Sequence, residues 1–238
     1  EFLGPTLKAV AGEKAGIMKP GVPCATGFQD AAAMDVLERV AAERGATLLA
    51  RGRDWRCDIT AGGMLYADAR GALELPRPSL PGPHQADNAG IAIAALRAWN
   101  PEWLTDEAIA RGVAAAEWPA RLQRLHGTLA RSLPAGFELW LDGGHSAGAG
   151  VALAEHFATW QDRPLHLIVG MKKGKASEEF LRPLLPFATS LHAVAEPGQH
   201  LAMSVEDIVA TSGGVAVPGP TVAEALARVA RAQPAGRV

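Results

Sequence analysis

The chain has 238 residues, of which 48% are hydrophobic and 20% are charged, so it can bury the core of one large domain or of two ordinary ones. Its formal net charge of −2 excludes a broad basic surface for nucleic acid or anionic lipid. The two cysteines, Cys24 and Cys57, lack the spacing of a disulfide scaffold or a zinc site and fit the reducing cytoplasm.

The first part of the chain predicts a mixture of short helices and strands. Helical spacing of apolar residues, capping residues and glycine stops indicate the helices, and short alternating runs indicate the strands. Gly62-Gly63 is expected to join two strands as a hairpin. In chain order we expect a helix over 6–15, a strand over 21–26, a helix over 30–44, strands over 48–49, 55–60, 64–67 and 73–75, and helices over 84–99 and 105–117.

Beyond the hinge-like segment Trp118-Pro119, strands and helices alternate regularly. Repeated strand–helix units with continuous apolar strands predict an α/β fold, in which helices cover both faces of a mostly parallel sheet. We therefore expect two parts, with a boundary at about residue 120. Strands are expected over 128–131, 137–142, 165–171, 191–194 and 215–217, and helices over 147–160 and from Ser177, Ser204 and Thr221.

The loop that follows the strand over 137–142 carries polar and glycine residues. Ligands of open parallel sheets bind at the carboxyl ends of strands, which singles out the stretch 142–150. Asp142 and His145 flank two glycines, and the following helix start offers free amides to an anion. A tight strand-to-helix turn that Asp142 caps explains the same pattern. The stretch is not a GxGxxG fingerprint, so a nicotinamide cofactor is not supported.

Three other positions allow both a binding and a structural interpretation. His84 and Asn88 open a helix, where they either contact an adenine edge or cap the helix. Arg121 lies at the expected boundary, as a salt-bridge partner or as a cation delivered to phosphates across a closing cleft. Lys14 follows Glu13 near a helix end, and the pattern alone favours a solvated ion pair.

Two features remain. The cluster Lys172-Lys173-Gly174-Lys175 follows a strand, where it either contacts a polyanion or is simply solvated, and His166 is interpreted as a core histidine.

The sequence contains no GxxxxGK[ST] phosphate loop, nucleophile elbow or HExxH motif. If the protein handles ATP, its phosphate loop lies upstream of Glu1. We therefore expect this chain to be the C-terminal portion of a longer protein.

Several motifs occur in a fixed order along the chain: Phe2-Leu3-Gly4, Glu13-Lys14-Ala15-Gly16-Ile17, Gly82-Pro83-His84-Gln85 with Asn88-Ala89, Trp118-Pro119-Ala120-Arg121-Leu122-Gln123 and Leu141-Asp142-Gly143-Gly144-His145. Their order and spacing, up to about Lys175, resemble the folylpolyglutamate synthase/dihydrofolate synthase family of the Mur ligase superfamily. The resemblance implies the tail of a Mur-ligase-type central ATPase domain over 1–120. A Rossmann-like C-terminal domain with a mostly parallel sheet is implied over 121–238.

The resemblance also implies an activity. Members of the family are ATP-dependent carbon–nitrogen ligases of folate biosynthesis and one-carbon metabolism, which join L-glutamate to dihydropteroate or a folate through an acyl phosphate. ATP and Mg²⁺ are the implied cofactors, and the partners are these small molecules, with no nucleic acid or membrane. A cytoplasmic monomer is implied for the full-length protein. Because the phosphate loop is missing from this sequence, we expect residues 1–238 alone to be inactive.

Individual site residues follow from the resemblance. Lys14 matches a catalytic lysine that carbon dioxide carbamylates, which would make it an oxygen ligand of Mg²⁺. His145 matches a catalytic histidine at the nucleotide or glutamate site. The matched ATP contacts are Asn88 near the base, Arg121 near the phosphates, Asp142 near the ribose, and His84. The chain departs from the family pattern at Ser146-Ala147, usually Asn-Pro, and at Ala176, often an aspartate.

Two other functions remain open at this point. A Mur-type ligase acting on a cell-wall precursor would share most of these motifs, although His84-Gln85 and Phe2-Leu3-Gly4 favour the folate branch. A non-catalytic nucleotide-binding or interaction module is the alternative from another functional class.

Overall fold

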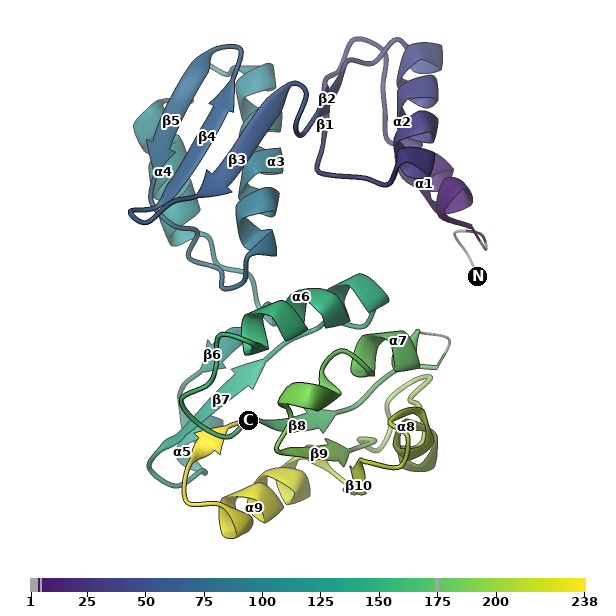
Figure 1. Cartoon of the computed structure of the whole chain (residues 1–238), viewed down its shortest axis with the longest axis vertical. Coiled ribbons are helices and arrows are strands. Elements are labelled where there is room, and N and C mark those ends of the chain that lie inside the picture. Colours follow the sequence, from purple (N-terminus) through teal and green to yellow (C-terminus); the bar gives the residue numbers. More distant parts are fainter. Residues whose placement is uncertain (1–3, 5, 174–175) are drawn as a thin grey trace. The chain divides into compact units, whose positions relative to one another are not determined.

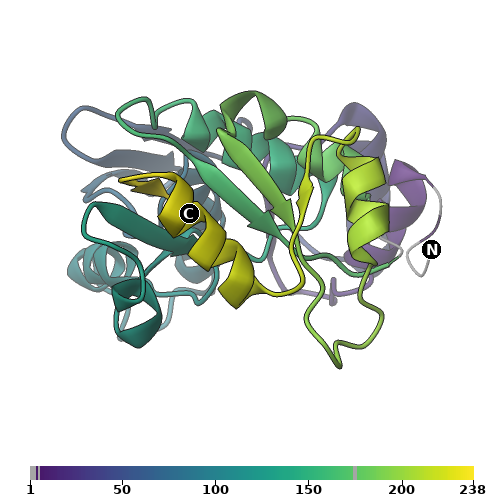
Figure 2. The same ribbon diagram turned by 90° about the horizontal axis from the view of Figure 1, so that it is seen from below.

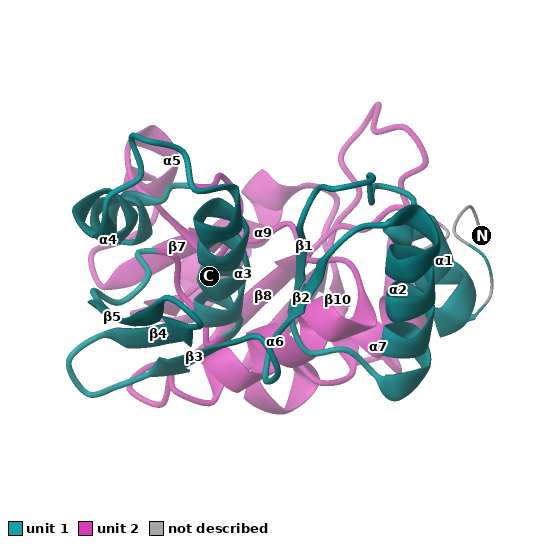
Figure 3. Cartoon of the chain, turned by 90° about the horizontal axis from the view of Figure 1, so that it is seen from above, with its two compact units in different colours: residues 1–79, 84–117 teal, residues 80–83, 118–238 magenta. Residues whose placement is uncertain are grey.

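The computed structural model describes residue 4, residues 6–173 and residues 176–238, which fall into two compact units (Figures 1 and 3). Unit 1 comprises residues 1–79 and 84–117, and unit 2 comprises residues 80–83 and 118–238. Both combine helices with parallel strand pairs, which confirms the predicted α/β class. The assignment of 1–120 and 121–238 to the two Mur-ligase domains stays a prediction. Within the described residues, no helix is long and apolar enough to cross a lipid bilayer.

Unit 1 contains a parallel strand pair and an antiparallel sheet. The strands β1 and β2 are parallel, with the helices α1 and α2 packed beside them, and β3, β4 and β5 form the antiparallel sheet that α3 and α4 cover (Figure 1). The elements are α1 (Leu7–Ala15), β1 (Cys24–Thr26), α2 (Ala31–Arg44), β2 (Leu48–Ala50), β3 (Trp55–Ile59), β4 (Met64–Asp68), β5 (Gly71–Leu75), α3 (His84–Trp99) and α4 (Asp106–Ala115).

The core of unit 1 lies between α3 and the antiparallel sheet. Strand alternation turns Trp55, Cys57 and Tyr66 inward, and all three are buried. The helix approaches closely because Gly90 has no side chain: a Cβ there would lie 2.6 Å from Cζ3 of Trp55 and 2.9 Å from Cβ of Cys57. The thiol of Cys57 donates to the carbonyl oxygen of Ala86 at 3.3 Å. A larger residue at position 90 would therefore separate the helix from the sheet.

Unit 2 is built on strands that run mostly parallel. The sheet β10–β9–β8 is parallel, β11 lies parallel to β7, and β6 lies antiparallel to β7. A bridge between Leu165 and Arg237 links the two sheets. The helices α6 and α7 cover one face, and α9 crosses the other (Figures 1 and 2). The elements are β6 (Gln123–Leu125), α5 (Thr128–Arg131), β7 (Phe137–Leu141), α6 (Ala147–Phe157), β8 (His166–Val169), α7 (Ser177–Leu181), η1 (Leu185–Phe187), β9 (Ser190–Ala193), α8 (Val205–Thr211), β10 (Val217–Pro218), α9 (Val222–Ala232) and β11 (Gly236–Arg237).

The strand predicted over 128–131 is wrong, because these residues form the short helix α5. Gly127, with a φ of 88°, reverses the chain before them, and the amide of Ser132 then bonds to the carbonyl of Thr128 at 3.1 Å. The strand that pairs with β7 in this region is β6, which lies earlier in the chain. An apolar alternation of four residues is too short to distinguish one helical turn from a strand.

Candidate functional site

The candidate site of unit 2 lies where β7 ends and α6 begins. Ser146 is the N-cap of α6, and its hydroxyl accepts a hydrogen bond from the amide of Ala149 at 3.3 Å. Asp142 instead caps the turn that leads into the helix, as its structural interpretation expected, because its Oδ1 accepts from the amide of Gly144 at 2.7 Å. Its carboxylate is available for contacts inside the loop.

Asp142 ties this loop to the segment that precedes β6. One carboxylate oxygen, Oδ2, accepts from the amide of Leu122 at 2.7 Å, and the other, Oδ1, accepts from the amide of Gly144 at 2.7 Å. The amide of Gly143 donates to the carbonyl of Ala120 at 2.8 Å. Hydrogen bonds to an ionised carboxylate are stronger than those between neutral groups. These bonds therefore hold the loop and the segment firmly together.

The segment around Arg121 has a strained backbone. Ala120 and Leu122 have φ angles of 56° and 44°, in the left-handed region that costs a non-glycine residue about 1–2 kcal/mol. The bonds to Asp142 and Gly143 hold this conformation, and the side chain of Leu122 is buried beneath it. Arg121, between the two strained residues, is exposed and makes no ion pair within the described part of the chain. The fold thus keeps a guanidinium group available to an anion.

His145 lies on the same loop. Its side chain is exposed, and its Nδ1 atom lies 3.0 Å from the carbonyl oxygen of Gly143. A carbonyl only accepts, so Nδ1 is the donor in this contact. Unit 2 therefore brings together Arg121, Asp142 and His145, which the sequence singled out.

A cavity of ≈ 490 Å³ opens beside the loop. Asp142, His145 and Lys172 contribute polar groups to its lining, but most of the lining is apolar and comes from α6, β8 and the region of α7. Such a surface does not suit a triphosphate. Lys172 and Lys173 are exposed after β8, and Gly174-Lys175 of the same cluster lies outside the described residues, as do Phe2 and Leu3 of the first motif.

The candidates of unit 1 include the start of α3. Nε2 of His84 lies 3.0 Å from Nε2 of Gln85, and Oε1 of Gln85 accepts from Nδ2 of Asn88 at 3.0 Å. Sequence reasoning missed Arg51, whose guanidinium pairs with Asp87 of the same helix. No local sequence pattern predicts this contact, because Arg51 and Asp87 are far apart in the sequence. The side chain of Asn88 is exposed at the helix start, and that of His84 is half-buried.

Lys14 lies in the last turn of α1 with its side chain exposed. Among the described residues, no three His, Cys, Asp or Glu side chains are grouped as metal ligands. Lys14, His84 and Asn88 belong to unit 1, whereas the loop after β7 belongs to unit 2.

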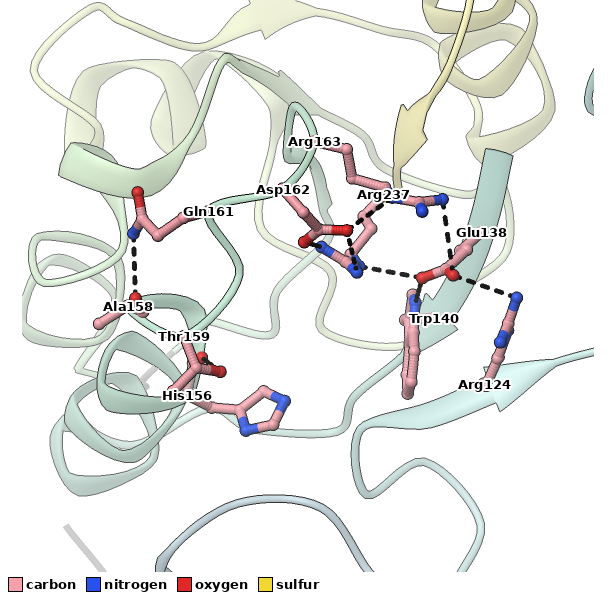
Figure 4. Close-up of polar contacts among 10 residues, drawn as sticks. All are labelled: Arg124, Glu138, Trp140, His156, Ala158, Thr159, Gln161, Asp162, Arg163 and Arg237. Atoms are coloured by element: carbon pink, nitrogen blue, oxygen red, sulfur yellow. Dashed lines mark hydrogen bonds and ion pairs between the residues drawn. The ribbon is translucent and has the colours of Figure 1, made fainter. Parts of the chain in front are cut away.

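A cluster of charges holds β11 against β7 (Figure 4). The carboxylate of Glu138 forms salt bridges with the guanidinium groups of Arg237 at 2.9 Å and Arg124 at 3.2 Å. Arg237 also forms a salt bridge with Asp162 at 2.6 Å. The hydrogen bond from Arg237 is the main cause that lowers the pKa of Asp162 to about 2. Burial raises the pKa of Glu138, but hydrogen bonds from Arg237 and Trp140 outweigh it and lower the pKa overall. These cations are neutralised, so the cluster is structural.

Comparisons with known proteins support one family. No protein-family model matches the chain. A dihydrofolate synthase/folylpolyglutamate synthase of Bacillus subtilis is 30% identical over 202 residues, which are 80% of this chain and 45% of that protein. The solved structure of Escherichia coli FolC in complex with DHPP and ADP matches 99% of this chain with a TM-score of 0.84 and 26% identity.

A second structural match is a bifunctional folylpolyglutamate synthase/dihydrofolate synthase with Mn, AMPPNP and L-glutamate bound. It covers 100% of this chain, with a TM-score of 0.84 and 25% identity. The chain spans 53% and 54% of these two solved proteins, about half of their length. Sequence and fold agree, and the chain belongs to the folylpolyglutamate synthase/dihydrofolate synthase family of the Mur ligase superfamily.

Proposed function

We propose that this chain is part of an ATP-dependent ligase that adds L-glutamate to dihydropteroate or to a folate. The observation that carries the proposal is the match to folate ligases along nearly the whole chain, in structures of complexes with ADP or with AMPPNP, Mn and L-glutamate. The chain spans about half the length of these proteins, so the activity belongs to the full-length protein. We also expect that protein to be a cytoplasmic monomer.

The proposed reaction proceeds in two steps. The γ-phosphoryl group of ATP is transferred to the acceptor carboxylate, which gives an acyl phosphate and ADP. The amine of L-glutamate then attacks the acyl carbon, an amide bond forms, and phosphate leaves. A carboxylate is a poor electrophile, so most of the catalytic task is to neutralise phosphate charge and to position the reactants.

Arg121 and Asp142 suit two different tasks in this reaction. Arg121 is an exposed guanidinium without an ion pair among the described residues, and it is assigned to the ATP phosphates. Each oxygen of Asp142 accepts one backbone amide and keeps capacity for a second hydrogen bond, which fits the ribose hydroxyls. The same carboxylate positions Arg121 through the amide of Leu122.

The remaining site residues keep the roles that the resemblance implies. His145 is assigned to the nucleotide or glutamate site, and Asn88 and His84 are assigned to the base of ATP. The divalent metal is proposed to be Mg²⁺, with a carbamate on Lys14 as one ligand. No catalytic step is assigned to this metal.

The test is an acceptor assay with the full-length protein. ADP release that requires both L-glutamate and dihydropteroate or a folate is the expected result. Release that instead requires a cell-wall precursor would assign the protein to the other branch of the superfamily. Residues 1–238 alone should release no ADP above background, because their sequence contains no phosphate loop.

A further inference from the structure

A second cavity, of ≈ 610 Å³, lies in unit 1 where the last turn of α3 meets the end of β4 and the start of β3. None of the residues assigned above to ATP, glutamate or the metal lines it. Its lining includes the exposed residues Gly52, Arg70 and Ala98, so the cavity is open to solvent. We call this space, lined by Trp55, Asp68, Arg70, Ala94 and Arg97, the α3–β4 cavity.

Arg97 brings a buried positive charge to the α3–β4 cavity. It lies in the last turn of α3, and its side chain is only 7% exposed. The Nε atom lies 3.2 Å from Oδ2 of Asp68, which pairs the two charges, but neither Nε nor Nη1 has a hydrogen-bond partner among the described residues. Buried donors normally have an acceptor, because the loss of water without a replacement is costly. Arg97 therefore has donors that an acceptor in the cavity would satisfy.

The carboxylate of Asp68 is already used by other donors. Its Oδ1 accepts from the amide of Arg70 at 2.8 Å, and its Oδ2 accepts from the hydroxyl of Tyr66 at 3.1 Å. This carboxylate therefore balances the charge of Arg97 without satisfying its hydrogen-bond donors. Since a single ion pair holds the guanidinium of Arg97 within the described part of the chain, the group can turn toward another acceptor.

Arg70 adds a second guanidinium at the rim of the cavity. Its Nη1 donates to the carbonyl oxygen of Arg97 at 2.9 Å, which holds the side chain beside the end of α3. Arg70 is exposed and has no ion pair with any described residue. Two guanidinium groups thus lie next to each other, and only one of them is paired with a carboxylate.

The other cations of the lining are less available. Arg53 is neutralised by Asp54 at 3.0 Å and by Glu38 at 2.6 Å. The side chain of Arg56 points to the opposite face of the sheet from that of Trp55, because successive side chains of a strand alternate. Arg70 and Arg97 are therefore the cations that an anion in the cavity would contact.

The rest of the lining is almost entirely apolar. It includes Leu49 of β2 and Ala94 and Ala98 of α3, whose small side chains leave room beside the two arginines. A volume of ≈ 610 Å³ exceeds that of an inorganic ion and lies in the usual range for small organic ligands. An apolar wall beside two guanidinium groups suits a molecule with a charged end and an apolar body.

We propose that the α3–β4 cavity binds a small organic anion whose phosphate or carboxylate group contacts Arg70 and Arg97. The apolar part of this molecule would lie against Leu49, Ala94 and Ala98. Guanidinium groups bind phosphate and carboxylate through the same paired N–H donors, so both groups fit this site. The proposal does not depend on the ligase reaction, because the two sets of residues do not overlap.

The test measures binding to the isotope-labelled chain by NMR at constant ionic strength. The reporter is the indole N–H of Trp55, which lines the cavity and donates to the carbonyl oxygen of Leu49 at 3.1 Å. Trp103, which does not line the cavity, is the reference. We expect phenyl phosphate, benzoate or both to shift the Trp55 signal to saturation, and inorganic phosphate to bind more weakly because it has no apolar part. The tighter of the two aromatic probes identifies the preferred anionic group.

Two variants test the assigned contacts. Arg70→Ala should weaken binding about fivefold or more, because a charged hydrogen bond is lost. Arg111→Ala, at an exposed position of α4 outside the lining, should leave the affinity unchanged. Arg97→Lys keeps the charge but presents fewer donors, so it should also weaken binding while circular dichroism shows an intact fold.

Three results would overturn the proposal. The first is the absence of saturation at Trp55 with any probe at tens of millimolar in the folded, unchanged chain. The second is equal affinity in Arg70→Ala and Arg111→Ala, which would indicate general charge attraction. The third is a folded Arg97→Lys variant that binds as tightly as the unchanged chain, because Arg97 would then serve only the ion pair with Asp68.

Discussion

Arg121 combines exposure with a fixed backbone, and that combination suits a residue that binds phosphate without a large loss of entropy. Its neighbours Ala120 and Leu122 are held by hydrogen bonds to the strand-end loop. Arginines that pair with carboxylates are already neutralised, as Arg237 is by Asp162. Arg121 has no such partner among the described residues.

We predict that Arg121→Ala in the full-length protein weakens ADP binding about tenfold or more, because a charged hydrogen bond contributes about 1.5–3 kcal/mol. Calorimetric titration measures the effect. Arg231→Ala is the control, since this exposed arginine lies in the last turn of α9. Equal ADP affinity in the two variants would remove Arg121 from the binding site.

The sequence singled out these candidate residues, but it did not predict their contacts. Asp142 follows β7 directly, and the rule that ligands bind at strand ends was enough to single it out. Its hydrogen bond to Leu122 joins residues with no pattern between them, so no local signal predicts it. For the same reason, the positive φ angles beside Arg121 are absent from the prediction, since neither residue is a glycine.

At the scale of elements, the loop after β7 depends on the carboxylate of Asp142. We predict that Asp142→Asn lowers the free energy of unfolding of unit 2 by about 1–3 kcal/mol, because an amide side chain has one acceptor oxygen where the carboxylate serves two backbone donors. Urea unfolding measures the loss. Glu155→Gln, an exposed change of the same kind on α6, should have almost no effect. Similar losses in both variants would contradict the role of Asp142.

The strained hinge before β6 gives the opposite kind of prediction. Ala120→Gly should raise the free energy of unfolding by about 0.5–1 kcal/mol, because glycine adopts a φ of 56° without steric cost. Ala223→Gly in α9 is the matched control and should lower the free energy by a similar amount. Thermal unfolding of the three proteins provides the comparison. A loss in the Ala120 variant would mean that its methyl group is needed for packing.

Elements of ordinary length were predictable from spacing and caps, whereas very short ones were not. The helix predicted from Thr221 is α9, and Thr221 is its cap. The strand β11 has two residues and was missed, because two residues carry no periodicity. Its place in the sheet is set by contacts with β7 and by the salt bridges of Arg237, which only the folded chain reveals.

At the scale of the whole molecule, pH couples to stability through two buried histidines. His166 and His192 flank the hydroxyl of Ser190, at 2.9 and 3.3 Å. Burial lowers the pKa of both side chains, with smaller contributions from the charge of His192 on His166 and of Arg228 on His192. The neutral forms are therefore favoured in the folded state.

We predict that the free energy of unfolding is highest above about pH 6.5, the ordinary pKa of histidine, and that it falls as the pH drops below this value. The unfolded chain then binds protons that the folded chain does not. Each histidine adds a slope of at most about 1.4 kcal/mol per pH unit. Urea unfolding between pH 7 and pH 5 should show a shallower slope in His192→Gln than in the unchanged chain. Parallel slopes would contradict the assignment.

Both cysteines of the sequence lie in unit 1, and one of them is sealed by the close packing at Gly90. Burial raises the pKa of the Cys57 thiol to about 11, so the thiolate that reacts with alkylating reagents is scarce while the fold is closed. The rate at which iodoacetamide modifies Cys57 therefore reports how often unit 1 opens around this side chain. Unit 2 has no thiol, so its opening does not contribute to thiol modification, and the measurement is specific to unit 1.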